Sequence, residues 1–149
     1  VFRGWWGSER QFGDQFVPLG GAKRFVQSNP SALCLATLLG SLEVFEVTSI
    51  DAVRGESYRM CMLFRDLVKD LVDSKHLQIL TPAEYERSGA QLTLLFPKHN
   101  HESVFKQLRQ QGIVTDTRHT SIRIAFVALY NDDGDVRALS DALHAILSS

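Results

Sequence analysis

The chain has 149 residues, the length of one ordinary domain, and its 44% apolar and 22% charged residues are typical of a folded globular protein. Its 16 Lys+Arg against 17 Asp+Glu give a formal net charge of -1, which excludes the strongly basic surface of a dedicated nucleic-acid-binding protein and a polybasic membrane patch. No apolar run in the sequence reaches the length that spans a bilayer. We therefore expect neither nucleic acid nor membrane as a partner.

Five glycines and Pro18 punctuate the first 28 residues, with aromatic residues between them, a composition typical of loops laid over a larger body. A helix is expected next, because Asn29 can cap it and Pro30 suits the first helical position, where no N–H is needed. Apolar side chains occur nearly all round this helix, at Leu33, Leu35, Leu38, Leu39, Leu42 and Phe45. A helix with this pattern is expected to be buried on several sides.

A second, longer helix is expected from about Ser49, with one apolar stripe that reaches Val72 and one charged face. After Lys75 the pattern predicts strand, strand, helix, strand, strand, helix, at residues 76–80, 90–96, 102–111, 113–116, 122–129 and 136–147. Asp132 or Asp133 is available to cap the last helix. This order predicts a small α+β domain, in which helices cover one face of a sheet.

Few residues indicate chemistry on their own. The sequence contains no P-loop, no dinucleotide-binding glycine motif and no nucleophile elbow. His99 and His101 have no further Cys or His at ligand spacing, so we expect a loop before a helix and no metal site. Cys34 and Cys61 lie in apolar helical stretches and are expected to be buried free thiols.

Arg123 is the most informative single residue, because it interrupts the apolar strand at residues 122–127. A guanidinium in such a strand needs an anion. One interpretation is a structural ion pair with a nearby Asp or Glu, and the other is a bidentate clamp for a substrate carboxylate. The residues alone leave both interpretations open.

Trp5 and Trp6 lie between two glycines, and paired indoles in such a loop serve either as packing or as a stacking face with an N–H donor. Packing is the interpretation that the residues alone favour. Asn29 is first a helix cap, but the N-terminus of a helix also suits a phosphate. These positions are therefore candidates for an anion site.

Together these segments resemble the kynureninase family in the same order along the chain. The matching stretches are Gly4-Trp5-Trp6-Gly7, Gln27-Ser28-Asn29-Pro30, Ser41-Leu42-Glu43-Val44-Phe45, Glu86-Arg87-Ser88-Gly89-Ala90-Gln91-Leu92-Thr93, Gly112-Ile113-Val114-Thr115-Asp116-Thr117-Arg118 and Ile122-Arg123-Ile124-Ala125-Phe126-Val127-Ala128-Leu129-Tyr130-Asn131. No single motif is decisive, but the order and spacing of all of them cover essentially the whole chain.

The resemblance implies an α/β protein, namely the C-terminal small α+β domain of a fold-type I pyridoxal-phosphate enzyme plus the end of its large domain. It places the end of the large domain and a linking helix at residues 1–48 and the small domain at residues 49–149. The activity implied is hydrolysis of kynurenine or 3-hydroxykynurenine to alanine and an anthranilate, in tryptophan catabolism. A homodimer in the cytoplasm is implied as well.

The family's functional residues carry over at three positions. Trp5 and Asn29 match positions that contact pyridoxal 5'-phosphate near its phosphate group, where contacts often cross the dimer interface. Arg123 matches the arginine that binds the α-carboxylate of the substrate. The resemblance therefore favours the clamp over the purely structural ion pair.

Several positions depart from the family pattern. Ser8 stands where members commonly carry a His that helps to hold the substrate ring, and Phe126 and Ala128 replace two family prolines. The Schiff-base lysine of the family has no match among the five lysines, and the chain begins at Val1 without Met. We therefore expect a C-terminal fragment that is inactive alone.

Two alternatives stay open at this stage. One is another fold-type I pyridoxal-phosphate enzyme, such as a cysteine desulfurase or an aminotransferase relative. The other is a non-catalytic fragment that folds alone, against which the apolar helix after Pro30 argues, because it would be exposed.

Overall fold

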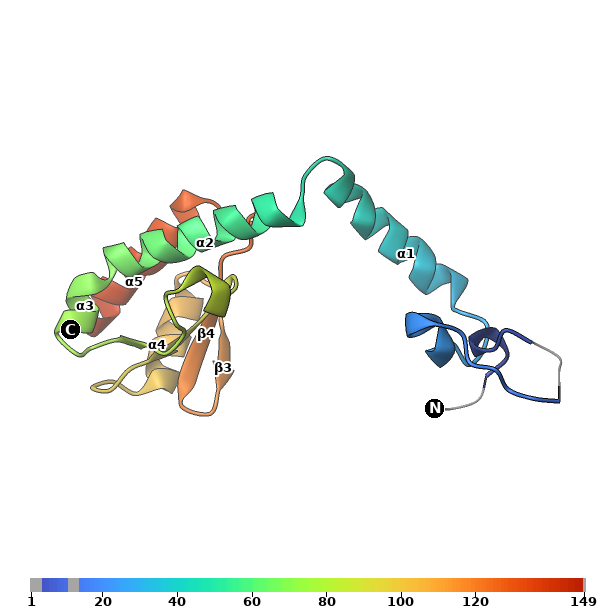
Figure 1. The fold of residues 1–149 in the computed structure, drawn as a ribbon. Coiled ribbons are helices and arrows are strands. Elements are labelled where there is room, and N and C mark those ends of the chain that lie inside the picture. Colours follow the sequence, from blue (N-terminus) through green and yellow to red (C-terminus); the bar gives the residue numbers. More distant parts are fainter. Residues whose placement is uncertain (1–3, 11–13, 149) are drawn as a thin grey trace. The chain divides into compact units, whose positions relative to one another are not determined.

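The computed structural model describes residues 4–10 and 14–148, and describes Trp5 by its backbone alone. The chain divides into two compact units, Val1–Val47 and Thr48–Ser149, and each is described by itself (Figure 1). The assignment of residues 1–48 to a large domain and of 49–149 to a small one stays a prediction. No single described helix is long and apolar enough to cross a membrane, although Ala32–Glu46 and Ile50–Leu67 pass that test as a bent pair.

Unit 1 is built from short helical turns and one longer helix. Its elements are η1 (Trp5–Gly7), η2 (Gly21–Phe25), α1 (Ala32–Glu43) and η3 (Val44–Glu46). The chain after η1 runs antiparallel to residues 17–19, since the N–H of Glu9 donates to Val17 O and the N–H of Leu19 donates to Gly7 O. The expectation of a loop-rich first segment is therefore confirmed for the described residues.

Two expectations about the helix after Pro30 are wrong. Ser31 caps α1, since its hydroxyl accepts the N–H of Cys34, so the helix begins two residues later than Pro30 and Asn29 does not cap it. No residue of α1 is buried, and Leu33 is 82% exposed. Cys34 is consequently an exposed thiol rather than a buried one. The apolar pattern was correctly found, but none of the residues that the structure describes buries it.

Unit 2 has the α+β architecture that the sequence predicts. Its helices are α2 (Ile50–Leu67), α3 (Lys69–Asp73), η4 (Tyr85–Arg87), α4 (His101–Gln110) and α5 (Asp133–Leu147). Its strands are β1 (Gln78–Ile79), β2 (Gln91–Leu95), β3 (Asp116–Arg118) and β4 (Ser121–Ala125). All neighbours pair antiparallel in the order β1-β2-β4-β3.

Alternation along the two central strands separates a buried face of the sheet from an open one. Leu92, Leu94, Ile122 and Ile124 are buried and belong to the same core as residues of α2, α4 and α5. Arg123 lies between the two isoleucines and therefore points to the opposite face. The helices thus cover one face of the sheet, as expected, and leave the face with Arg123 for other contacts.

The ends of the helices follow the polar residues that the sequence offers. Ser49 caps α2, Asn100 caps α4, and Asp132 caps α5 in a reciprocal pair of hydrogen bonds with Asp135. Gly112 follows α4 with a φ of 80°, the left-handed conformation that glycine adopts most easily. The expected helix starts at Ser49 and Asp132 are confirmed.

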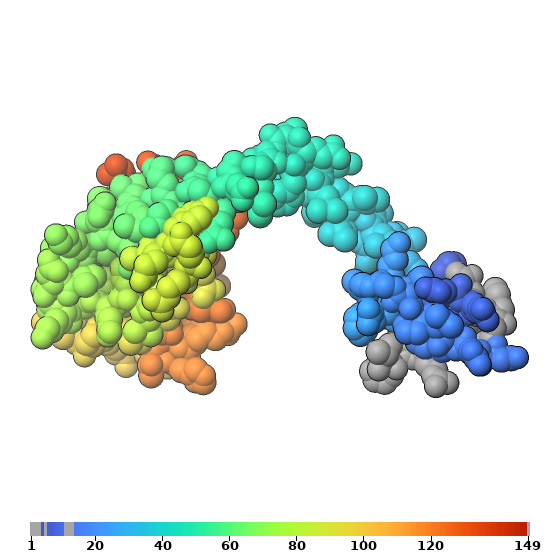
Figure 2. Space-filling model, in the orientation of Figure 1, coloured from blue at the N-terminus to red at the C-terminus, as the bar shows by residue number. Residues whose placement is uncertain are grey.

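A loop after β1 is held against α2. The Arg54 guanidinium donates to Tyr85 O at 2.7 Å, and the Tyr58 hydroxyl donates to Ala83 O at 2.9 Å. The same segment, yellow-green in the space-filling view, lies against α2 on the face drawn (Figure 2). These contacts fix the loop that leads into β2, the strand that pairs with the strand of Arg123, β4.

Candidate active site

Arg123 lies on β4, and the register of the sheet fixes the residue beside it on each of the two neighbouring strands. It pairs with Thr93 on β2 and with Asp116 on β3. Its side chain is 32% exposed, which leaves the guanidinium at the surface of the open face. Because both neighbouring strands fix its backbone, the position of Arg123 depends on the sheet rather than on a loop.

The guanidinium of Arg123 forms an ion pair with Asp116. Its Nε–H donates to Asp116 Oδ2 at 3.0 Å, and its Nη2 donates to the same oxygen. Arg118 also approaches that oxygen, at 3.4 Å. Two arginines therefore share one carboxylate, and the excess positive charge favours an anion at this place.

The electrostatics of this cluster keep Asp116 ionised. The hydrogen bond from Arg123, followed by the positive charge of Arg118, lowers the pKa of the Asp116 carboxyl below its ordinary value. The structural ion pair that the residues alone allowed is therefore present. It uses the side edge of the guanidinium, Nε and Nη2, and in the described part of the chain no group accepts from Nη1.

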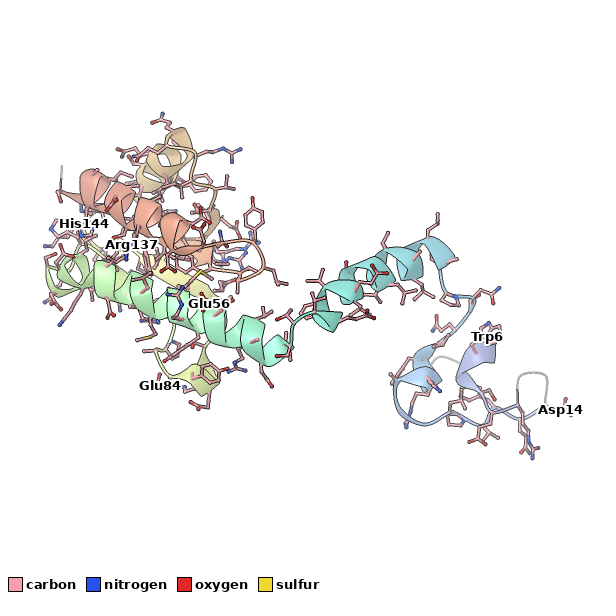
Figure 3. The ribbon with its side chains drawn as sticks, turned by 90° about the horizontal axis from the view of Figure 1, so that it is seen from above. Trp6, Asp14, Glu56, Glu84, Arg137 and His144 are labelled. Atoms are coloured by element: carbon pink, nitrogen blue, oxygen red, sulfur yellow. The ribbon has the colours of Figure 1, made fainter. Side chains whose placement is uncertain are left out.

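The predicted cofactor position Asn29 is engaged by the neighbour of Trp5. The indole Nε1–H of Trp6, labelled in Figure 3, donates to Asn29 Oδ1 at 2.8 Å. Since the amide oxygen is taken, the amide N–H groups of Asn29 remain as donors, without a partner among the described residues. Trp5 begins η1, and its side chain lies outside the described part of the structure.

Close backbone contacts hold the Trp-containing turn against the segment that precedes Asn29. A Cβ at Gly4 would lie 2.6 Å from Gln27 O, and a Cβ at Gly7 would lie 2.6 Å from Arg24 O. Only glycine fits such an approach. The two glycines of the motif are therefore required for packing, and they bring Trp6 to Asn29.

The positions that depart from the family pattern have local structural uses here. The hydroxyl of Ser8 accepts the N–H groups of Arg10 and Val17, and the side chain is buried. The N–H of Phe126 donates to Ala90 O, and the N–H of Ala128 donates to the Ser57 hydroxyl. Proline at either of the last two positions would remove the donor.

Two features near the sheet were missed by the sequence analysis. The hydroxyl of Thr115 is buried without a hydrogen-bond partner among the described residues, in the wall of a cavity of about 250 Å³ between the end of β4 and α5. His76 and His99 are joined by a hydrogen bond of 2.8 Å between Nδ1 and Nε2. Neither feature follows from spacing along the chain, since each depends on the tertiary fold.

Two further expectations concern the thiol of Cys61 and a metal site. Cys61 is buried in the core, as expected, and burial raises the pKa of its thiol to about 11. Among the residues that the structure describes, no three His, Cys, Asp or Glu side chains gather at distances that suit a metal ion.

Several solved structures have this fold. The cysteine desulfurase CsdA from Escherichia coli aligns with 99% of the chain at a TM-score of 0.71 and 18% identity, and 38% of its own chain is covered. A cysteine desulfurase from Thermococcus onnurineus aligns with 98% of the chain at a TM-score of 0.70 and 14% identity, again with 38% covered. At these identities the likeness shows the fold alone. The fold is that of the C-terminal part of fold-type I enzymes.

The family follows from the sequence comparisons. The model of the kynureninase C-terminal domain matches residues 53–143. Kynureninase from Monosiga brevicollis is 37% identical over 99% of the chain, and kynureninase 2 from Neurospora crassa is 33% identical over 97%. The chain covers 35% and 32% of these two proteins, about a third of their length. The chain therefore belongs to the kynureninase family.

Proposed function

We propose that the chain supplies the carboxylate-binding arginine and part of the phosphate site of a kynureninase. That enzyme would hydrolyse kynurenine or 3-hydroxykynurenine to alanine and an anthranilate. Since the chain spans about a third of its relatives' length, the proposed activity is that of a whole enzyme to which these residues contribute. The observation that carries the proposal is the free terminal edge of Arg123 on the open face of the sheet.

The α-carboxylate of the substrate would bind to Nη1 and Nη2 of Arg123. A planar guanidinium presents two parallel N–H donors along that edge, which match the two oxygens of a carboxylate. The role of Arg123 would be to orient the amino acid, because a fixed carboxylate limits how the rest of the molecule can turn.

Asn29 and Trp5 would contribute to the site of pyridoxal 5'-phosphate. The amide N–H groups that Asn29 keeps free suit a phosphate oxygen, and α1 begins three residues further on, at Ala32. The residues present therefore fit the phosphate end of the cofactor. When bound, that cofactor supplies an electron sink for negative charge that develops beside the amino-acid carbon. Two copies in a homodimer would complete such a site, in the cytoplasm.

Ser8 weakens one part of the family's substrate recognition. Its hydroxyl is used by the N–H groups of Arg10 and Val17, so it is not available to a substrate ring. We therefore propose that the ring is held by other residues of the enzyme. The preference between kynurenine and 3-hydroxykynurenine would then depend on those residues.

The test uses the product of the complete reading frame that contains these residues. It should bind pyridoxal phosphate, seen by absorbance, and release alanine from kynurenine. Binding of the cofactor without release of alanine from kynurenine or from 3-hydroxykynurenine would refute the proposal. Release of sulfur from cysteine, assayed with the same protein, would favour the cysteine desulfurase alternative.

Replacement of Arg123 by Lys tests the clamp within that enzyme. The positive charge is kept but the planar fork is lost, so KM for kynurenine should rise by roughly tenfold or more. Arg59→Lys is a matched control, since Arg59 is also an ion-paired surface arginine, held by Glu56 and Asp133. An unchanged KM in Arg123→Lys would exclude the clamp.

A further inference from the structure

The ion pair between Arg123 and Asp116 has an asymmetry that bears on how a substrate could bind. Asp116 lies directly opposite Arg123 in the β3–β4 register, and it accepts both donors through one oxygen, Oδ2. Those donors are Nε and Nη2, which form the side edge of the guanidinium. The terminal edge, Nη1 with Nη2, points away from this contact because the guanidinium is planar.

Two roles for Asp116 are conceivable from this contact. As a competitor, it would occupy the arginine and have to leave when a carboxylate ligand arrives. As a support, it would hold the side edge while the ligand binds to the terminal edge. Asp116 uses only the side edge of the guanidinium, and this favours the supporting role, because Arg123 can then bind the carboxylate of Asp116 and that of the ligand at the same time. Arg118, at 3.4 Å from the same Oδ2, also helps to keep Asp116 in place.

Solvent exposure decides which effect of Asp116 is larger. The Asp116 side chain is 46% exposed, so water screens its repulsion of a second carboxylate. The orientation of the long arginine side chain is not screened, since it depends on direct hydrogen bonds. Loss of the support would therefore leave Arg123 free to adopt several rotamers, and binding a ligand would require ordering it again.

We propose that Asp116 is a positioning residue that fixes the Arg123 guanidinium by its side edge and leaves the terminal edge for the α-carboxylate of an amino-acid substrate. This inference rests on the proposed function, in which Arg123 binds that carboxylate. Arg118 shares Asp116 and so supplies a second positive charge next to the site. Asp116 itself does not touch the substrate.

The first test is steady-state kinetics of Asp116→Asn in the complete enzyme. The amide keeps the shape and one acceptor oxygen but removes the charge, so KM for kynurenine should rise by roughly fivefold or more while kcat stays within about twofold. Asp133→Asn is the matched control, since Asp133 is equally exposed, at 46%, and is also paired with an arginine, Arg59. It should leave both constants unchanged.

The outcomes separate the two roles. A lower KM in Asp116→Asn would show that Asp116 competes with the substrate, and an equal KM would show that it does not act on binding. Either result overturns the proposal. A fall in kcat alone would also overturn it, because a positioning residue for the carboxylate acts on binding.

A second measurement distinguishes this inference from the proposed function. The Nε–H resonance of Arg123 is followed by NMR in the complete enzyme, with and without L-alanine, which carries the same α-carboxylate as kynurenine. The inference expects slow exchange of this proton with solvent, a shift on addition of L-alanine, and at least fivefold weaker binding of L-alanine in Asp116→Asn. These results together with an enzyme that does not cleave kynurenine would refute the proposed function alone. L-alanine binding that Asp116→Asn leaves unchanged or strengthens would refute the inference.

Discussion

The indole Nε1–H of Trp6 donates to Oδ1 of Asn29 at 2.8 Å, across 23 residues of the chain. This bond joins the glycine-flanked tryptophan motif to the segment before α1, two stretches that match the family separately. It also fixes which end of the Asn29 amide faces outward. The hydrogen bond therefore joins two motifs that are separate in the sequence.

Gly4→Ala should disrupt the contact between the tryptophan motif and the segment that contains Asn29. The added Cβ would lie 2.6 Å from Gln27 O, and backbone on both sides prevents an easy shift. We expect the indole N–H resonance of Trp6 to move toward its position in an unfolded chain. Gly20→Ala is the matched control, since no described residue beyond its chain neighbours lies within 4 Å of the added Cβ and its φ is -71°. A Trp6 resonance unchanged in Gly4→Ala would contradict the packing described for the motif.

Asn29→Asp should weaken cofactor binding in the complete enzyme. The carboxylate can still accept the indole N–H of Trp6, but it repels a phosphate and has lost the amide donors. We expect the Kd for pyridoxal phosphate to rise by roughly tenfold or more. Asn29→Ala, which loses the bond to Trp6 as well, serves for comparison. Equal affinity in the wild type and Asn29→Asp would remove Asn29 from the phosphate site.

Leu108→Ala should strongly destabilise unit 2. Leu108 is completely buried against the core, so the truncation leaves a cavity, and the free energy of unfolding should fall by about 2–5 kcal/mol. Leu33→Ala in α1 is the control with the same chemical change, and at 82% exposure it should alter stability by less than about 0.5 kcal/mol. Urea titration, followed by a signal from unit 2, measures both. Equal effects would show that α1 is covered in solution.

His144 should titrate above its ordinary pKa. Its Nε2 faces both carboxylate oxygens of Asp70, and its Nδ1 faces the carbonyl oxygen of Ser140, so only the doubly protonated ring satisfies both sides. The hydrogen bond to Asp70 is the main cause of the raised pKa. Figure 3 shows His144 on α5, which packs beside α2.

The sign of the pH dependence follows from this shift. Because the folded pKa of His144 lies above 6.5, its contribution to stability is complete below that pH and is lost as the pH rises through the folded value. His99 should behave in the opposite way, since burial, His76 and Lys98 lower its pKa. Proton NMR of the ring resonances measures both. Asp70→Asn should bring His144 back toward 6.5, and an unchanged His144 titration in that variant would refute the pairing.

The order of elements in unit 2 could be predicted because the helical and the strand periodicities agree with the helix starts expected at Ser49 and Asp132. The third strand was placed wrongly, at residues 113–116. Ile113 and Val114 resemble a strand, but the N–H of Ile113 closes the end of α4 by donating to Leu108 O. Pairing begins only at Asp116, because a tight turn with His119 at a φ of 50° sets the register with β4.

The residues of the candidate site could be named from the sequence, but their partners could not. Spacing along the chain indicates that Arg123 needs an anion, but it does not say which edge of the guanidinium that anion uses. At Asn29, several polar residues in a row could cap the helix, and Ser31 does so. The choice among near-equal caps depends on local backbone angles, which composition does not determine.

The absence of any buried residue in α1 has a consequence for hydrogen exchange. Twelve residues form a helix of marginal stability in water when nothing packs against it. Its amide hydrogens should therefore exchange soon after transfer to heavy water, while those of β2, β4 and the buried turns of α2 should persist until unit 2 opens as a whole. Thermal melts followed by circular dichroism should then show two separate transitions, one for α1 and one for unit 2. The helical signal lost first would belong to α1.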